Sequence, residues 1–255
     1  MSRDFTVEEL SVRVFDDVQT LARAAVADAV EAMRRAIRDR GEANIMLATG
    51  NSQLVFLAAL MEHGDVDWSQ VTAFHMDEYV DLPATHTASF HRYMREKVGA
   101  RLPLRQFHYL HGDTGDAQAE VDRYAGLLRS HPLDLCVCGF GENGHLAFND
   151  PPVADFDDPV GVKVVALESA SRRQQVAEGH FATIDDVPTH AITVTIPALV
   201  RAGRLLAIVP ELRKAVPVRD ALLGPIATSC PASLLRRQPH ATLYLDVDSA
   251  SLLDQ

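Results

Sequence analysis

Cysteine and long apolar runs are both scarce in this sequence, and each shortage excludes a class of protein. The 255 residues include three cysteines, Cys136, Cys138 and Cys230. Their number and spacing provide neither a disulfide framework nor a CxxC metal site, so we expect reduced core thiols and a cytoplasmic protein. No apolar run approaches the roughly 18 residues of a membrane span. The N-terminus lacks the basic-then-apolar pattern of a signal peptide, so none is expected.

Positive charge is also in short supply. The chain has 24 lysines and arginines against 35 aspartates and glutamates, a net charge of −11. Such a field repels nucleic acid and anionic membranes, and we expect neither as a partner. An anionic small molecule would have to be held by local groups.

Strand-like and helix-like segments alternate along the whole chain. Asp16 or Asp17 is expected to cap the first helix, whose apolar residues recur every three or four positions from Val18 to Ile37. Further helix-like segments are Leu54–Met61, Ala117–Leu128 and Arg219–Leu223, and the apolar strand-like runs are Asn44–Thr49, Val71–Met76, Leu133–Gly139, Val162–Leu167, Ala191–Ile196, Leu205–Val209 and Ala241–Leu245. Alternation with such runs predicts an α/β fold, a doubly wound and mainly parallel sheet with helices on both faces. With no evident linker, residues 1–255 are interpreted as a single domain.

Ligands of such sheets gather beyond the carboxyl ends of the strands, so the functional residues are expected in the segments that follow the apolar runs. The segment Thr49, Gly50, Asn51 and Ser52 lies between a strand and a helix. Its small and hydroxyl side chains leave backbone N–H groups accessible at a helix N-terminus, where they can bind a phosphate group. A plain turn with a helix cap is the alternative.

Two adjacent carboxylates, Asp77 and Glu78, follow the run Val71–Met76. A core strand has no need of them. They are either part of a solvated turn or a base beside a carboxylate that orients the base or the substrate.

The segment Gly139–Pro151, GFGENGHLAFNDP, is the most informative. Its glycines, Gly141 among them, allow the backbone to approach a ligand closely. His145 can give and take a proton at neutral pH, and Asp150 could hold its tautomer. A structural histidine is the alternative, but glycine, amide, imidazole and carboxylate together favour a site.

These segments resemble those of the glucosamine-6-phosphate deaminase family, a branch of the superfamily that also holds 6-phosphogluconolactonases. The matching motifs are ATGNS at 48–52, MDEYV at 76–80 and GFGENGHLAFNDP at 139–151, in the same order and rough spacing. The similarity extends from about residue 10 to 246. Lactonases typically continue after the histidine with Thr-Ala-Ser, unlike Leu146–Asp150 here.

The resemblance implies a Rossmann-like fold and isomerisation of an amino-sugar phosphate with loss of ammonia, without a cofactor or a metal. By motif, Asp77 is the base that moves a proton between carbons 2 and 1, and His145 opens the sugar ring. Asn143 and Asp150 support the histidine. Thr49–Ser52, Glu78, Gly141 and Lys214 would then contact the substrate, Lys214 through its phosphate.

Several positions depart from the family pattern. Asn143 stands where many deaminases have Asp, Asp150 where they have Glu, and Phe90 where several have Tyr. The family's phosphate-contacting arginine falls near Glu178, so we expect Arg172 or Arg173 to reach the pocket instead. Pro217 is expected to kink the helix after Lys214.

Three other functions remain as alternatives. Lactone hydrolysis is one, and a non-catalytic sugar-phosphate sensor is another, although this acidic chain has no room for a DNA-binding domain. A metal-dependent hydrolase would need ligands such as His75, Asp77 and His145, but no HExxH or CxxC spacing supports it. The sequence leaves the oligomeric state open, a homo-oligomer included.

Overall fold

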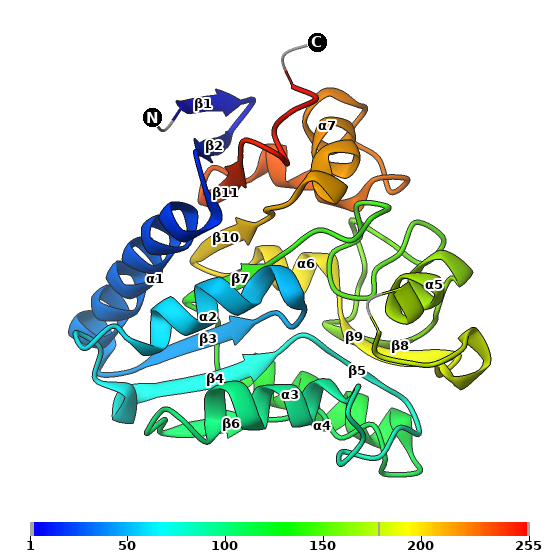
Figure 1. The fold of residues 1–255 in the computed structure, drawn as a ribbon. Coiled ribbons are helices and arrows are strands. Elements are labelled where there is room, and N and C mark those ends of the chain that lie inside the picture. Colours follow the sequence, from blue (N-terminus) through cyan, green and yellow to red (C-terminus); the bar gives the residue numbers. More distant parts are fainter. Residues whose placement is uncertain (1–2, 178, 254–255) are drawn as a thin grey trace.

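Eleven strands form two sheets in the computed structural model, which describes residues 3–177 and 179–253 (Figure 1). The larger sheet has the order β1-β2-β11-β10-β7-β3-β4-β6, and β1, which pairs antiparallel to β2, is its one antiparallel strand. Its strands are β1 (Arg3–Val7), β2 (Leu10–Phe15), β3 (Ala43–Leu47), β4 (Val71–His75), β6 (Gln106–His108), β7 (Leu135–Cys138), β10 (Arg204–Ile208) and β11 (Ala241–Asp246). The predicted mainly parallel sheet is confirmed.

Helices cover both faces of this sheet. The described helices are α1 (Val18–Arg40), α2 (Leu54–Met61), α3 (Phe90–Met94), α4 (Ala117–Ser130), α5 (Ser169–Ala177), α6 (Ile196–Val200) and α7 (Ala215–Leu223). Apolar residues of α1 and α2 belong to one core cluster, and those of α4, α6 and α7 to another. Asp17 caps α1, accepting a hydrogen bond from the backbone N–H of Thr20 at 2.7 Å.

The central strands are buried on both faces, as their continuous apolar runs predict. In β7, Cys136 and Cys138 belong to the core cluster that contains α4, whereas Leu135 and Val137 belong to the cluster that contains α1. Side chains of a strand alternate between faces, so one run supplies both cores. The two cysteines therefore share one side of a buried strand.

A second sheet of three antiparallel strands was not predicted. It consists of β5 (Asp77–Tyr79), β9 (His190–Val194) and β8 (Val162–Ala166) in the order β5-β9-β8. The prediction that the runs at 162–167 and 191–196 lie in the main sheet is wrong. In β8 Val164 is exposed and Lys163 is half-buried, so this strand lacks the continuous burial of the central strands of the main sheet.

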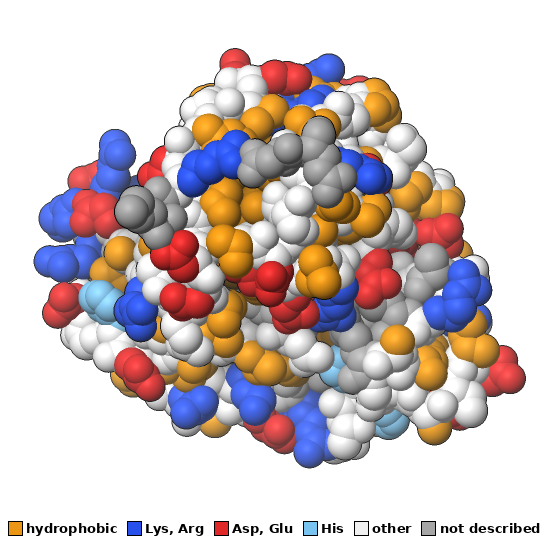
Figure 2. All heavy atoms as spheres, turned by 45° about the horizontal axis from the view of Figure 1, so that its top comes forward, with side chains coloured by type: hydrophobic (Ala, Val, Ile, Leu, Met, Phe, Trp, Pro, Cys, Tyr) orange, Lys and Arg blue, Asp and Glu red, His pale blue; other side chains and the backbone are white. Residues whose placement is uncertain are grey.

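Positive and negative side chains are mixed on the face shown in Figure 2, which gives that face no field of a single sign. None of the described helices is long and apolar enough to cross a membrane.

Candidate active site

The carboxyl ends of four neighbouring strands, β10, β7, β3 and β4, surround one cavity. The segments that follow these strands line it: Arg213 and Lys214, Gly139–Gly141, Thr49–Ser52, and Asp77. Further lining residues come from the chain before and within α3 and from the region of α5, namely Thr87–Phe90, Tyr93, Gln175 and His180. His145, Ala147 and Phe148 complete the wall from the glycine-rich segment. This is the edge where doubly wound sheets bind ligands.

The loop Thr49–Ser52 joins β3 to a short 3-10 turn, Asn51–Gln53, that leads into α2. Gly50 has φ 105°, a conformation that favours glycine. The buried side chain of Gln53 donates to the carbonyl of Ile208 at the end of β10, at 3.2 Å. The loop is thereby fixed to the neighbouring strand, with the start of a helix facing the cavity.

Asp77 begins β5, two residues beyond the end of β4, and it lines the cavity while only 7% of the residue is exposed. Burial, and secondarily the charge of Glu78, raises the pKa of Asp77 to about 8. Its Oδ1 atom is buried without a hydrogen-bond partner among the described residues. A carboxyl group with a pKa near neutrality and an unpaired oxygen in a cavity is suited to proton transfer.

Glu78 points away from the cavity. Its carboxylate accepts four hydrogen bonds, from the backbone N–H groups of Tyr79, Phe90 and His91 and from the hydroxyl of Ser89, at 2.7–3.2 Å. It therefore anchors the N-terminus of α3, and the structure does not place it in the cavity lining as a substrate contact. Although these donors lower the pKa of Glu78, burial raises it above its ordinary value.

His145 presents one ring nitrogen to acceptors. Its Nδ1 lies 2.8 Å from Asn143 Oδ1 and 2.9 Å from Asp150 Oδ1. Since amide and carboxylate oxygens only accept, Nδ1 carries the hydrogen, and Nε2 of the neutral ring is left as a base. Burial raises the pKa of Asp150, but hydrogen bonds with His145, Asn143 and Ser171 outweigh it and keep that pKa low. Asp150 is therefore charged and accepts the hydrogen of His145 Nδ1.

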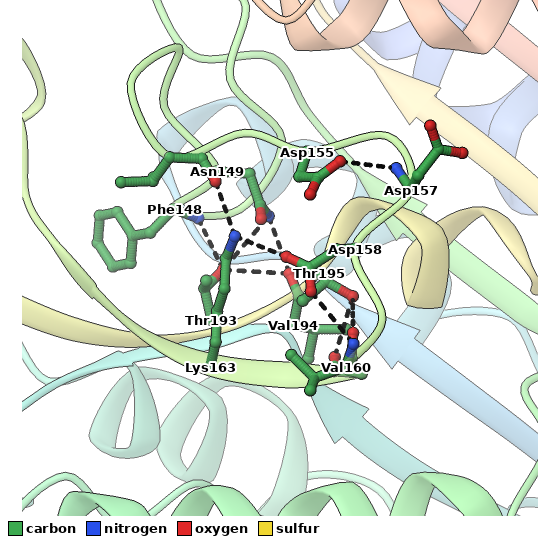
Figure 3. Close-up of polar contacts among 12 residues, drawn as sticks. Phe148, Asn149, Asp155, Asp157, Asp158, Val160, Lys163, Thr193, Val194 and Thr195 are labelled. Atoms are coloured by element: carbon green, nitrogen blue, oxygen red, sulfur yellow. Dashed lines mark hydrogen bonds and ion pairs between the residues drawn. The ribbon is translucent and has the colours of Figure 1, made fainter.

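The segment after His145 is attached to the small sheet (Figure 3). Asn149, buried, donates through Nδ2 to the carbonyls of Leu146 and Val194 at 2.8 and 2.9 Å. The backbone N–H of Phe148 donates to Thr193 Oγ1 at 3.1 Å. Because Asp77 and Thr193 are register partners in β5 and β9, this small sheet connects the segment of His145 with the strand of Asp77.

Lys214 ends a 3-10 turn, Leu212–Lys214, that follows β10. The residue is only 3% exposed, and its Nζ donates to the carbonyl of Phe140 at 2.7 Å. The predicted kink at Pro217 is wrong, because Pro217 lies in the first turn of α7, where its missing N–H has no partner to lose.

A family model described as glucosamine-6-phosphate isomerases/6-phosphogluconolactonase matches residues 16–244. The chain belongs to this family. It is 31% identical over 246 residues to a glucosamine-6-phosphate deaminase of Bacillus cytotoxicus, covering 96% of this chain and 90% of the relative. It is 34% identical to one of Bacillus thuringiensis over 219 residues, covering 86% and 81% of the two chains.

Solved structures of the isomerase/lactonase family share the fold. A monomeric glucosamine-6-phosphate deaminase aligns with a TM-score of 0.86 at 27% identity, covering 94% of this chain and 99% of the other. A 6-phosphogluconolactonase from Shewanella baltica aligns with a TM-score of 0.77 at 19% identity, covering 95% and 99%. The predicted resemblance is confirmed, and so is the fold.

Asn143, which departs from the deaminase pattern, has a role that suits a neutral side chain. Its Nδ2 donates to Asp150 Oδ1 at 2.9 Å and to Glu168 Oε2 at 3.1 Å. An aspartate here would place a third carboxylate against two others and lose both donors. The amide instead connects two carboxylates while its oxygen accepts from His145.

Arg172 and Arg173 do not line the cavity. The guanidinium of Arg172 donates to the carbonyls of Ile184 and Val187 at 2.6 and 2.9 Å, so it stabilises the loop after α5. Arg173 is exposed. The expectation that one of them completes the phosphate pocket is therefore not met, and Glu178 lies outside the described residues. Arg213 is the arginine that lines the cavity.

Sequence reasoning missed the contribution of α5 and the residues around it. Ser171 donates to Asp150 Oδ1 at 2.6 Å, and Gln175 and His180 line the cavity. No motif marks these residues. For Arg213 a signal existed, since it adjoins Lys214.

His75 is unsuited to binding a metal. Its buried Nε2 accepts a hydrogen bond from the backbone N–H of Leu110 at 2.8 Å, and burial lowers its pKa to about 3, with the charge of His91 as a smaller cause. Within residues 3–177 and 179–253, no three His, Cys, Asp or Glu side chains are grouped so as to hold a metal ion.

Proposed function

We propose that this chain converts glucosamine 6-phosphate and water into fructose 6-phosphate and ammonia. The observation that carries the proposal is that three groups line one cavity. They are His145, whose tautomer is fixed, the buried carboxyl group of Asp77 and the buried Lys214. The names of the deaminase relatives support it.

His145 opens the sugar ring in this proposal. The closed ring must open before the hydrogen on carbon 2 becomes acidic. The imidazole takes the proton of the hydroxyl on carbon 1 and gives a proton to the oxygen of the sugar ring. Asp150 stabilises the imidazolium that exists between these two transfers. Such general acid–base steps typically contribute roughly a hundred- to ten-thousand-fold each.

Asp77 then moves the proton from carbon 2 to carbon 1. Loss of the carbon 2 proton gives an enolamine, and its return to carbon 1, with a proton passing from the nitrogen to the former aldehyde oxygen, gives an imine at carbon 2 beside a primary alcohol. Water hydrolyses this imine to the ketone with release of ammonia. The carboxyl group must be ionised to act as the base. A 2-ammonium group beside it would favour ionisation, since an opposite charge lowers a carboxyl pKa. Electrons move only within the substrate, so no redox cofactor is proposed.

The phosphate is assigned to Lys214 and to the loop Thr49–Ser52. The loop offers N–H groups at a helix start and Lys214 a buried charge, both at the cavity wall. The three free cysteines agree with a reducing compartment, and we include a cytoplasmic location in the proposal.

Ammonia release from glucosamine, galactosamine and mannosamine 6-phosphates tests the function, with the unphosphorylated sugars as controls. We expect the fastest release from glucosamine 6-phosphate and little from free glucosamine. Hydrolysis of 6-phosphogluconolactone without ammonia release from any amino sugar would contradict the proposal and favour the lactonase alternative.

Removal of metal ions should leave the activity intact, because every proposed proton transfer is assigned to a side chain. Ammonia release is measured before and after dialysis against a strong chelator. A loss of activity that one divalent ion specifically restores would show that the proposed mechanism is incomplete.

A further inference from the structure

The phosphate pocket proposed above needs more than one cation. A phosphate dianion is to be held in a partly desolvated cavity of a protein with net charge −11. Lys214 supplies one positive charge. Among the described lining residues, the other lysine or arginine is Arg213.

We propose that Arg213 is the second phosphate-binding cation of this chain and sets its preference for phosphorylated sugars. The inference rests on the proposed function, which it deepens. Arg213 would then bind the phosphate in place of Arg172 of α5, whose guanidinium group is bound to two backbone carbonyl groups.

The turn that carries Arg213 is held in an unusual backbone conformation. Glu211, the residue before the 3-10 turn, has φ 85° and ψ 143°, which side-chain-bearing residues rarely adopt. Its N–H donates to both carboxylate oxygens of Asp246, at 3.2 and 3.0 Å, at the end of β11. Asp246 is itself buried and accepts from the N–H of Ser249 at 2.8 Å. A strained turn persists only where its surroundings enforce it, so this turn is rigid before any ligand binds.

The guanidinium group of Arg213 is oriented by the carboxylate of Glu211. Its Nε lies 2.6 Å from Glu211 Oε2, a short charge-assisted contact, and its Nη1 lies 4.0 Å from Glu142 Oε1, beyond hydrogen-bond range. The side chain keeps 31% of its surface exposed. Glu211 therefore aligns the group at Nε, while the side chain keeps part of its surface exposed and lines the cavity. Its planar fork matches the oxygens of a phosphate.

Arg213→Gln tests the inference, with Arg219→Gln as the matched control. Arg219 is an exposed arginine of α7 that pairs with Asp220 and does not line the cavity. Two quantities are measured: the KM for glucosamine 6-phosphate, and the Kd for inorganic phosphate by calorimetry without turnover. A lost charge-assisted contact should raise both about ten-fold or more in Arg213→Gln. The control should leave both unchanged.

A third readout separates phosphate binding from general damage. The residual turnover of unphosphorylated glucosamine, which offers Arg213 no phosphate, should fall much less in Arg213→Gln than kcat/KM for glucosamine 6-phosphate does. Equal KM and phosphate Kd values in the Arg213→Gln and Arg219→Gln proteins would overturn the inference. So would wild-type protein that binds no inorganic phosphate. If the wild type binds phosphate through Arg213 but releases no ammonia, the inference holds and the proposed function fails.

Discussion

His145→Gln should bind the substrate and release almost no ammonia. Glutamine keeps a polar side chain of similar reach but cannot carry a proton between the hydroxyl on carbon 1 and the ring oxygen. The expected loss in kcat is roughly a hundred- to ten-thousand-fold. The Kd for inorganic phosphate should stay at the wild-type value, because the phosphate is assigned to residues that follow β3 and β10 and not to His145.

The same variant should lose less on a substrate that is already open. A large part of its defect lies in ring opening, so the open-chain form should react closer to the wild-type rate. His190→Gln, at an exposed histidine outside the cavity, is the control and should be fully active. Near-normal turnover of cyclic substrate by His145→Gln would remove the imidazole from the mechanism.

Asp77→Asn should abolish proton transfer at carbon 2. In heavy water, the wild type should incorporate deuterium into substrate or product, and the variant should not. The kcat/KM of the wild type should rise with pH through an apparent pKa of about 8, because the free protein must ionise this buried carboxyl group. Deuterium incorporation at the wild-type rate in Asp77→Asn would assign the base elsewhere.

The same substitution should stabilise the fold at alkaline pH. The pKa of Asp77 is about 8 in the folded chain against 3.8 as its ordinary value, so the folded state binds the proton more tightly than the unfolded state. The contribution of protonated Asp77 to the free energy of unfolding is fully present below pH 4 and is lost as the pH rises through about 8. An asparagine has no such loss. Urea midpoints at pH 4 and pH 9 measure the difference between variant and wild type, which should grow with pH.

The matched control for stability is Asp122→Asn, at an exposed aspartate of α4. It should shift neither midpoint. A midpoint for Asp77→Asn that falls below the wild type at pH 9 would mean that the ionised carboxylate is stabilised in the folded chain, against the effect of its burial.

The sequence predicted those parts of the site that follow the ends of buried strands. Asp77 and His145 each come shortly after an apolar run, and parallel strands bring their carboxyl ends to one edge. Lys214, which lines the same cavity, was predicted from the family resemblance. Glu78 was assigned to the substrate because nothing in the sequence reveals which way a carboxylate points after a strand. The start of α3 at Ser89–His91, which donates hydrogen bonds to Glu78, lies 11 to 13 residues further along the chain, after a loop whose path the sequence does not reveal.

The contribution of α5 could not be predicted because it depends on which face of a short helix meets the cavity. Ser171 and Gln175 lie one turn apart on the side toward the site, whereas Arg172 lies toward the loop at Ile184. A register error of one residue exchanges these faces. The small sheet was missed for a related reason, since a strand's own sequence does not identify the sheet that it joins.

Gly141 has a consequence for how this chain can diverge. A Cβ built on Gly141 would overlap the imidazole of His145, which Asn143 and Asp150 hold in place. Every codon change that replaces glycine adds a Cβ, so no mutational step at this position is neutral for the imidazole. Its neighbour Glu142 is exposed at the surface, so a change of its side chain has no such steric effect on the imidazole. Substitutions in this segment are therefore expected at the neighbouring side chains, while position 141 stays glycine.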